Sequence, residues 1–407
     1  MTRDSTITRR RVLRTTLGGT AAVLALPAIS RSGFAAEAIK VGMPAALTGP
    51  LGEVGQQMKR GAEFFAKQQN AKGGINGRPI EFLIEDSAGD PATCVRKAQE
   101  MVERDKVSLL MGMTLSSEAL AVVPKLGAWN AIFVSSDDGD GRLTAQSFVP
   151  NFFRANTSGP MDTRTVALWL RTAPYKKFFG IGMDYAWGHN SVESFAKLVK
   201  AAGREFVGSV FSPIGTKDFS TYLLKIRQSG ADAVFIVMQG DDNVAFLTQA
   251  HEYRLPQQAQ LLTSIVDLAS IRAVGDASIG LAGSMRYAYT YDNPANKAFV
   301  ALWEKAHGQP PDIFEGEQWQ ACEILAAGIA KAGSIEPAKL RPALETVAID
   351  SIKGHVAMRA CDHQAVQQGF MVKVAKPAGA KLPLPQVVAV YPADKVTPAC
   401  RKETYDD

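Results

Sequence analysis

Two adjacent serines, Ser116 and Ser117, are the side chains in this sequence best placed to hold a small anionic group. They follow an apolar run over 107–113 that predicts a buried strand, and a segment of helical period over 118–130 comes next. Ligands of open parallel sheets bind beyond the carboxyl ends of the strands, where helix N-termini present free N–H groups. The two serines are therefore expected either to bind a ligand carboxylate or only to cap the helix, which is the commoner use of serine at such a position.

The sequence lacks the common motifs of enzymes and cofactor sites. Gly180 and Gly182 follow a strand-like run, but Tyr185 stands where a dinucleotide-binding fingerprint needs its third glycine. There is no P-loop and no nucleophile elbow, and His251-Glu252 lacks the second histidine of a zinc-protease motif. The five histidines show no metal-ligand spacing. We therefore expect no catalytic residue, no metal site and no cofactor, and an α/β enzyme is the weaker alternative.

Strand-like and helix-like segments alternate along the chain in two successive series. The expected strands are 39–44, 80–84, 107–113 and 132–134, then 177–183, 205–212, 233–238 and 261–264. Alternation of this kind predicts parallel sheets that are covered by helices on both faces. A further strand, three helices and a hairpin-like end over 369–391 follow. The fold class expected is α/β, with two doubly wound parallel-sheet lobes.

Composition and charge describe an ordinary globular chain. Its 407 residues are 46% hydrophobic and 21% charged, which is enough for two domains. The formal charge is +5, but residues 1–35 hold six arginines and one aspartate, which account for all of it. Residues 36–407 are therefore neutral overall. A neutral chain gives no electrostatic basis for binding nucleic acid or an anionic membrane.

The first 35 residues predict an export signal. The segment 8–14, Thr-Arg-Arg-Arg-Val-Leu-Arg, resembles a twin-arginine signal, although Val12 stands where an aromatic residue is usual. A weakly apolar run over 15–29 follows, and Gly-Phe-Ala over 33–35 suits cleavage. The apolar run is too short and too interrupted to favour a permanent span, so an uncleaved anchor is the weaker alternative. We expect a twin-arginine signal peptide over 1–35 and a mature periplasmic protein that does not span the membrane.

Four cysteines form no Cys-x-x-Cys pair and no zinc spacing; they are Cys94, Cys322, Cys361 and Cys400. An oxidising periplasm favours at least one disulfide. We favour Cys361–Cys400, because both residues flank what look like neighbouring terminal strands. Twin-arginine cargo often folds before export, so free buried thiols are the alternative.

Several short motifs occur in a characteristic order and spacing. They are Ile39-Lys-Val-Gly-Met-Pro44, Leu47-Thr-Gly-Pro50, the stretch 70–80 (Asn-Ala-Lys-Gly-Gly-Ile-Asn-Gly-Arg-Pro-Ile), Asp90-Pro91 and Asp184-Tyr-Ala-Trp-Gly188. Together they resemble the type I periplasmic solute-binding proteins of ABC importers, and most closely the branched-chain (leucine/isoleucine/valine) amino-acid-binding family. The resemblance covers most of residues 36–407. It implies two α/β lobes joined by three crossovers, with the ligand enclosed between them.

The resemblance also implies how the chain divides. We expect residues 36–155 with 282–350 in the N-terminal lobe, and residues 156–281 with 351–407 in the C-terminal lobe.

Ligand-binding roles follow for the positions that match the family. Ser116 and Ser117 fall where the family holds the ligand carboxylate, and Trp187 falls where it places an aromatic lid from the second lobe. The loop Asp137-Asp138-Gly139 follows the next strand, with two acids in place of the usual small residues. The remaining expected cleft positions are Val54, Asp241 and Val266.

Plainer roles compete for several of these residues. Trp187 could cap the core of the second lobe, and Asp137 with Asp138 could form a solvated or helix-capping pair. Asp241 is most simply an N-cap of a helix over 241–251. The family's ammonium-binding glutamate is missing, because Ile265 or Val266 aligns there.

The sequence therefore predicts an exported solute-binding protein that captures an amino acid, or a related carboxylate or amide. Its expected partners are this small molecule and an inner-membrane ABC permease with its ATPase subunits, and the protein is expected to be a monomer. A ligand-sensing protein that reports to a membrane receptor would use the same cleft and is the alternative.

Overall fold

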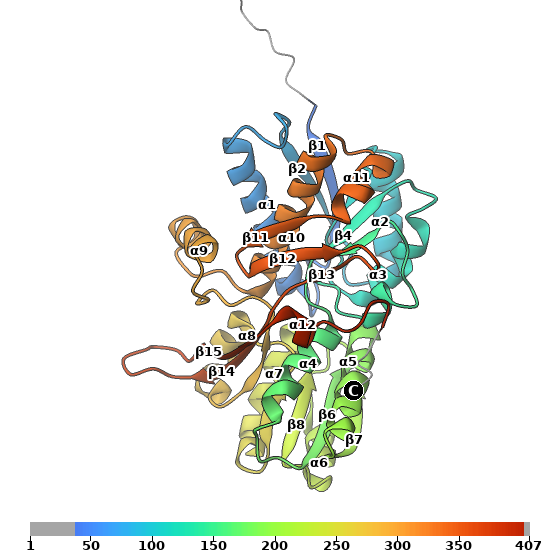
Figure 1. Ribbon diagram of the computed structural model, residues 1–407. Coiled ribbons are helices and arrows are strands. Elements are labelled where there is room, and N and C mark those ends of the chain that lie inside the picture. The colour runs from blue at the N-terminus through green and yellow to red at the C-terminus, as the bar shows by residue number, and fades with distance from the viewer. Residues whose placement is uncertain (1–36, 403–407) are drawn as a thin grey trace, which may run out of the picture. The chain divides into compact units, whose positions relative to one another are not determined.

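Two β-sheets flanked by helices make up the described part of the chain, residues 37–402 of the computed structural model (Figure 1). The signal peptide expected over 1–35 lies outside the described residues. Within them, no helix is long and apolar enough to cross a membrane.

The first sheet has eight strands in the described residues, in the order β11-β12-β13-β5-β4-β3-β1-β2. Their bounds are β1 Ile39–Ala45, β2 Ile80–Asp86, β3 Leu109–Leu110, β4 Ile132–Ser135, β5 Phe152–Arg154, β11 Ala348–Ser351, β12 Gly354–Arg359 and β13 Gln364–Val366. Strands β1 to β5 pair in parallel, and β13 pairs in parallel with β5. Strands β11 and β12 add an antiparallel edge, so the sheet is mixed rather than wholly parallel.

The second sheet has seven strands in the described residues, in the order β15-β14-β10-β9-β8-β6-β7. Their bounds are β6 Lys177–Met183, β7 Glu205–Ser212, β8 Ala233–Val237, β9 Gln260–Thr263, β10 Ala282–Met285, β14 Gly369–Ala375 and β15 Leu384–Tyr391. Strands β6 to β10 are parallel, while β14 and β15 are antiparallel. Every residue of β8 is buried, as expected for a continuous apolar strand covered on both faces.

Helices connect the parallel strands. Their bounds are α1 Gly52–Ala71, α2 Pro91–Glu103, α3 Ser116–Val122, α4 Gly159–Leu170, α5 Ala186–Ala201, α6 Ser220–Gln228, α7 Gly240–Glu252, α8 Leu268–Val274, α9 Pro294–His307, α10 Ile313–Ala332, α11 Pro337–Leu344 and α12 Ala393–Val396. Helix α1 packs against α10, and α4 packs against α5. Helix α2 begins where Asp90 accepts a hydrogen bond from the backbone N–H of Thr93 at 2.7 Å, with Pro91 in its first turn.

The chain passes between the two sheets three times within residues 37–402: after β5, after β10 and after β13. The expectation of two α/β lobes joined by three crossovers is confirmed. The changeover points differ from the boundaries expected at 282 and 351. Strand β10 continues the second sheet beside β9, and β12 and β13 belong to the first sheet, because Gln364 pairs with Arg154 of β5.

The chain bends between β3 and α3 where a longer strand was expected over 107–113. Gly112 and Met113 have φ of +87° and +60°, which ends the extended backbone after Leu110. Helix α3 begins at Ser116 rather than at 118, and it ends before Pro124, which has no N–H to continue the helix. These bends bring the serine pair to the edge of the sheet.

Cysteine chemistry and surface charge are both simple. Cys361 and Cys400 form a disulfide, while Cys94 and Cys322 are buried free thiols.

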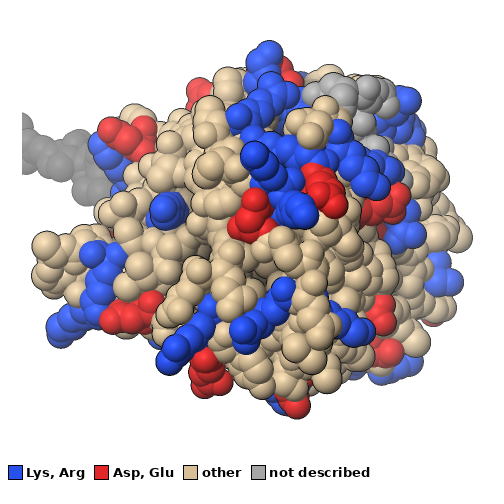
Figure 2. All heavy atoms as spheres, turned by 90° about the horizontal axis from the view of Figure 1, so that it is seen from below, with Lys and Arg blue, Asp and Glu red and all other residues tan. Residues whose placement is uncertain are grey.

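Viewed from below, the molecular surface shows lysines and arginines with acidic residues among them (Figure 2).

Candidate ligand-binding site

A small cavity of about 10 Å³ lies between the two sheets. Its lining residues are Thr114, Ser116, Asp137 and Gly139 after strands of the first sheet, Tyr185, Trp187 and Gln239 after strands of the second, and Arg286 after β10. All of them follow the carboxyl ends of parallel strands. This is the edge at which open α/β sheets bind their ligands.

Ser116 fastens the loop that forms one wall of the pocket. Its Oγ accepts hydrogen bonds from the backbone N–H groups of Gly139 at 3.0 Å and Asp140 at 3.1 Å. The residue before it, Leu115, is the N-cap of α3, and its N–H donates to the carboxylate of Glu118 at 2.9 Å. The hydroxyl of Ser116 therefore does not cap its own helix, and its proton can still be donated toward the pocket.

Gly139 allows the second sheet's side chains to approach this loop. A Cβ at this position would lie 2.5 Å from Cδ1 of Trp187 and 2.7 Å from Nη2 of Arg286. These distances are too short for any side chain, so glycine is needed for close approach rather than for its backbone angles. The indole of Trp187 thus rests on the backbone of the 137–140 loop.

Two aromatic side chains from the start of α5 form the opposite wall. Trp187 is buried, and no described residue accepts a hydrogen bond from its Nε1. The guanidinium carbon of Arg286 lies 5.9 Å from the centre of the Trp187 ring. The hydroxyl of Tyr185 accepts a hydrogen bond from Nε2 of Gln239 at 3.3 Å, and burial holds its pKa well above the ordinary value.

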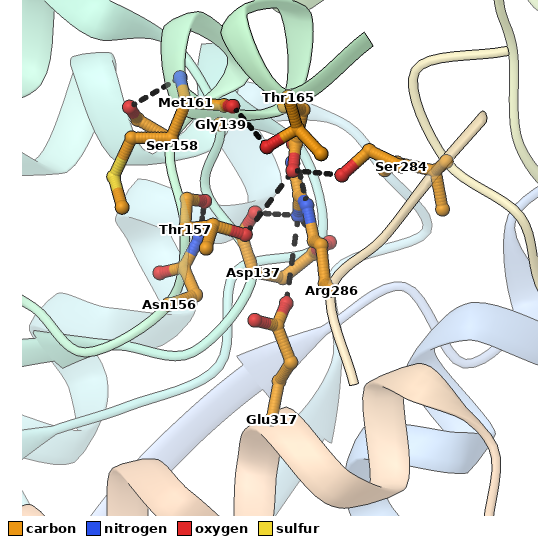
Figure 3. Close-up of polar contacts among 12 residues, drawn as sticks. Asp137, Gly139, Asn156, Thr157, Ser158, Met161, Thr165, Ser284, Arg286 and Glu317 are labelled. Atoms are coloured by element: carbon orange, nitrogen blue, oxygen red, sulfur yellow. Dashed lines mark hydrogen bonds and ion pairs between the residues drawn. The ribbon is translucent and has the colours of Figure 1, made fainter. Parts of the chain in front are cut away.

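Arg286 is the centre of a buried group of charges (Figure 3). Its Nε donates to Oδ2 of Asp162 on α4 at 2.9 Å, and its Nη1 donates to the carbonyl oxygen and Oδ1 of Asp137 at 2.8 and 2.9 Å. Oε2 of Glu317 on α10 lies 3.7 Å from Nη1, and Nζ of Lys353 donates to Oε1 of the same glutamate at 3.2 Å. We call these five residues the Arg286 cluster. It joins the first sheet, the second sheet and the second crossover.

Burial shifts the pKa values in this cluster. It raises the pKa of Asp137 to about 7, with Glu317 and Asp162 adding to the rise and Arg286 opposing it. The pKa values of Asp162 and Glu317 are also raised by burial. Burial acts to lower the pKa of Arg286, but the surrounding carboxylates raise it above the ordinary value, so this side chain is a cation throughout the physiological range.

A second buried arginine supports the loop from behind. Nη2 of Arg154 donates to the carbonyl oxygen of Asp140, and its Nη1 donates to Oε1 of Gln364 at 3.2 Å. Asp138 accepts a hydrogen bond from Oγ of Ser135 at 2.8 Å, and burial holds its pKa well above the ordinary value. These residues hold the loop in place and do not line the pocket.

Four of the nine positions expected from the sequence line this pocket: Ser116, Asp137, Gly139 and Trp187. The other five lie elsewhere. Ser117 is half-buried on α3, Asp138 points behind the loop, and Val54 and Val266 are packed in the core. The Asp241 side chain is exposed and pairs with Lys217 at 3.3 Å, and the N-cap of α7 is Gln239, two residues before Asp241.

The other four lining residues are Thr114, Tyr185, Gln239 and Arg286. Gln239 follows an apolar strand directly, and Arg286 is a charge that follows a run of small and apolar residues. In each case, a polar residue directly after a strand-like run could have indicated a place at the carboxyl edge of the sheet. Asp162 and Glu317, which contact Arg286, carried no such signal, because Asp162 lies 124 residues away in the sequence and Glu317 lies on the separate helix α10.

A model of the periplasmic binding protein family matches residues 38–380. The chain belongs to this family. It is 26% identical over 365 residues to "Leu/Ile/Val-binding protein homolog 6" of Brucella suis, an alignment that covers 87% of this chain and 92% of the relative. It is 25% identical over 341 residues to the leucine-, isoleucine-, valine-, threonine- and alanine-binding protein of Pseudomonas aeruginosa, covering 82% and 89%.

Solved structures share the fold. An ABC transporter substrate-binding protein from Sphaerobacter thermophilus superposes with a TM-score of 0.80 and 29% identity, over 87% of this chain and 98% of that one. A solute-binding protein of a Rhodopseudomonas palustris ABC transporter, in complex with 4-hydroxybenzoate, gives a TM-score of 0.81 and 24% identity, over 87% and 97%. The family and these relatives are substrate-binding proteins rather than enzymes, and a solute-binding role for this member is the expectation that they confirm.

Proposed function

We propose that this periplasmic binding protein captures a small organic solute in the pocket between its two sheets and delivers it to an inner-membrane ABC permease driven by ATPase subunits. It would act in the periplasm as a monomer after twin-arginine export. The observation that carries the proposal is that the pocket is lined from both sheets, so one ligand can contact both lobes at once.

The lobes of this proposal follow the sheets. The first comprises residues 37–155 with 287–366, and the second comprises 156–286 with 367–402. Ligand contacts from both sides would stabilise the closed arrangement relative to an open one, which is how hinge closure is coupled to binding. The first lobe would contribute Ser116 and the 137–139 loop, and the second would contribute Tyr185, Trp187 and Gln239.

The ligand class follows from the pocket and from what the relatives are named for. Curated relatives are named for aliphatic amino acids, and one structural relative holds 4-hydroxybenzoate. The pocket here combines two aromatic rings with an arginine, an aspartate, an amide and three hydroxyls. This mixture suits a small molecule with one polar head group and an apolar or aromatic body.

A thermal-shift screen of the mature protein tests the proposal. The panel holds amino acids, aromatic acids, short aliphatic acids and amides, after the protein has been unfolded and refolded to remove any bound solute. A ligand that binds the folded state should raise the melting temperature progressively with its concentration above Kd. A panel with no effect at millimolar concentrations would contradict the proposal.

Trp187→Ala should weaken the binding of any hit at least about tenfold, because the indole covers the pocket from the second lobe. Calorimetry measures the affinity, and urea unfolding checks the fold. Trp169→Ala is the matched control, because this tryptophan lies on α4, half-buried and outside the pocket. Equal losses of affinity in the two variants would remove Trp187 from the site.

A further inference from the structure

We infer that Asp137 and Arg286 together determine which head group the pocket accepts, and that they select solutes in which an N–H donor stands beside an oxygen acceptor over solutes with a plain carboxylate. Two kinds of solute have this chemistry, α-amino acids and carboxamides. The inference rests on the proposed function and names the substrate class of the same site.

The unpaired atoms of the two side chains carry the inference. Two of the three guanidinium nitrogens of Arg286, Nε and Nη1, donate to Asp162 and Asp137. Among the described residues, the hydrogen bonds of this pair use Nε and Nη1 of Arg286 and Oδ1 and the carbonyl oxygen of Asp137, which leaves Nη2 and Oδ2 for a ligand. Both residues line the pocket. The pair therefore offers a ligand one strong donor and one strong acceptor side by side.

Asp162 shows what a purely structural carboxylate looks like in the same cluster. Its Oδ1 accepts hydrogen bonds from the hydroxyls of Thr157 and Ser284, both at 3.2 Å, and its Oδ2 accepts from Nε of Arg286. Both of its oxygens are thus satisfied within the protein. Asp137 has the same arginine as its partner but leaves one oxygen without a donor. This oxygen is not fully buried, and Asp137 lines the pocket, so a ligand there can supply the hydrogen bond.

Charge points to the same kind of ligand. In the described residues, the Arg286 cluster holds three carboxylates against two cations, and at most 4% of any of these side chains is exposed. An ammonium placed at Asp137 would offset the excess negative charge, and an amide N–H would donate a hydrogen bond to it without adding charge. A plain carboxylate placed there would add a second one in a poorly solvated space, which is strongly unfavourable.

A plain acid could bind only if it brought a proton for Asp137, so the two cases have opposite pH dependence. The charged and titratable groups that face Asp137 are Arg286, Asp162 and Glu317, with Tyr185 across the pocket and Asp138 next to it in the chain. Because the pKa of Asp137 is about 7, its ionised fraction falls roughly tenfold between pH 8 and pH 6. The affinity for an N–H-bearing solute should therefore fall by about that factor, and the affinity for an acid should rise.

The experiment compares solutes that share one carbon skeleton. Leucine, 4-methylpentanamide and 4-methylpentanoate form one set, and phenylalanine, 3-phenylpropanamide and 3-phenylpropanoate form another. Isothermal calorimetry at pH 6 and pH 8, each in two buffers of different ionisation heat, gives affinity and protons exchanged. We expect the amino acid or the amide to bind at least about tenfold tighter than the matched acid at pH 8, with proton release near pH 7. Comparing the affinity of the amino acid with that of the amide in each set shows whether an ammonium or an amide supplies the N–H group.

Two variants separate a role in selection from a role in structure. Asp137→Asn keeps the shape but replaces the free oxygen by an N–H₂ donor, so it should shift the acid-to-amide affinity ratio at least about tenfold toward the acid and remove the pH dependence. Asp162→Asn should lower stability and affinity for every solute while keeping that ratio. The pH dependence of affinity is measured on the wild-type protein, so it tests the inference even if neither variant folds.

Preferential binding of the acids, tightening at pH 6 with proton uptake, would overturn the inference and leave the proposed function standing. An Asp137→Asn variant with an unchanged acid-to-amide ratio would also overturn it. Absence of binding by every solute of both sets, and by the thermal-shift panel, would remove the proposed function together with the inference.

Discussion

Gly139 lies where the indole of Trp187 and the guanidinium of Arg286 meet the backbone of the first sheet's loop. A glycine is needed here because a side chain would have no room. Its backbone angles do not require glycine, since its φ is not in the left-handed region. Ser116 holds the same loop through two backbone N–H groups. The position of the pocket wall thus depends on a missing Cβ and on one hydroxyl, and neither needs to contact the ligand.

Gly139→Ala should weaken ligand binding at least about tenfold, because the new methyl group would overlap both Trp187 and Arg286. Overpacking of this kind costs about 1–3 kcal/mol, so the protein should still fold. Calorimetry and urea unfolding measure the two effects. Gly127→Ala is the control, because a Cβ there meets no atom within 4 Å. An alanine at 139 with wild-type affinity would show that the lobes close without this contact.

At the scale of elements, a single carboxylate connects helices of the two sheets. Asp312 is the N-cap of α10, where it accepts from the N–H of Ile313 at 2.8 Å. It also accepts hydrogen bonds from the N–H groups of Leu268 and Ala269 at 2.8 Å each, at the start of α8. One side chain from the first lobe therefore satisfies N-terminal groups of a helix in the second. These bonds join the two lobes in this structure.

Asp312→Asn should weaken ligand affinity several-fold, because it removes the charge that stabilises two helix N-termini across the interface. Asp90→Asn is the control, since it changes the cap of α2 within the first lobe only. That control should lower stability by up to about 1 kcal/mol without changing affinity. Small-angle scattering with saturating ligand reports the fraction of closed molecules. Equal closure in wild type and Asp312→Asn would contradict the role given to this residue.

At the scale of the whole molecule, buried acids outnumber buried cations among the described residues. Burial raises the pKa of Asp137, Asp267 and Glu315 to about 7 each. A carboxyl whose pKa is higher in the folded than in the unfolded state binds more protons when folded. Stability from these groups is therefore present at low pH and is lost as the pH rises from about 4 to about 7.

The ligand-free protein should accordingly be more stable at pH 5.5 than at pH 7.5. His363 opposes this, because burial lowers its pKa and its protonation below about pH 6.5 costs stability. Among the described residues, the buried acids with a raised pKa outnumber this buried histidine, so the net effect should favour the lower pH. Urea midpoints at the two pH values measure it. A higher midpoint at pH 7.5 would show that these carboxylates are ionised in the folded state without penalty.

The sequence by itself determined the alternation of strands and helices, the two-sheet α/β fold and four residues of the pocket wall. The strands, the helices and the serine pair rest on local information: apolar runs, helical periods, and polar residues directly after a strand; the roles of the other three residues came from the resemblance to the family. Ser116 could be found because the carboxyl ends of parallel strands share one edge, whereas Asp137 and Trp187 were indicated by their match to family positions.

Only the tertiary structure decided the rest. It placed β10 in the second sheet and β12 and β13 in the first, because strand exchange depends on long-range pairing that periodicity does not encode. It also joined Arg286 to Asp137 and Asp162, which lie 149 and 124 residues away in the sequence. Burial and partners, which only folding supplies, turn those ordinary charged residues into a donor and an acceptor aimed at one small pocket.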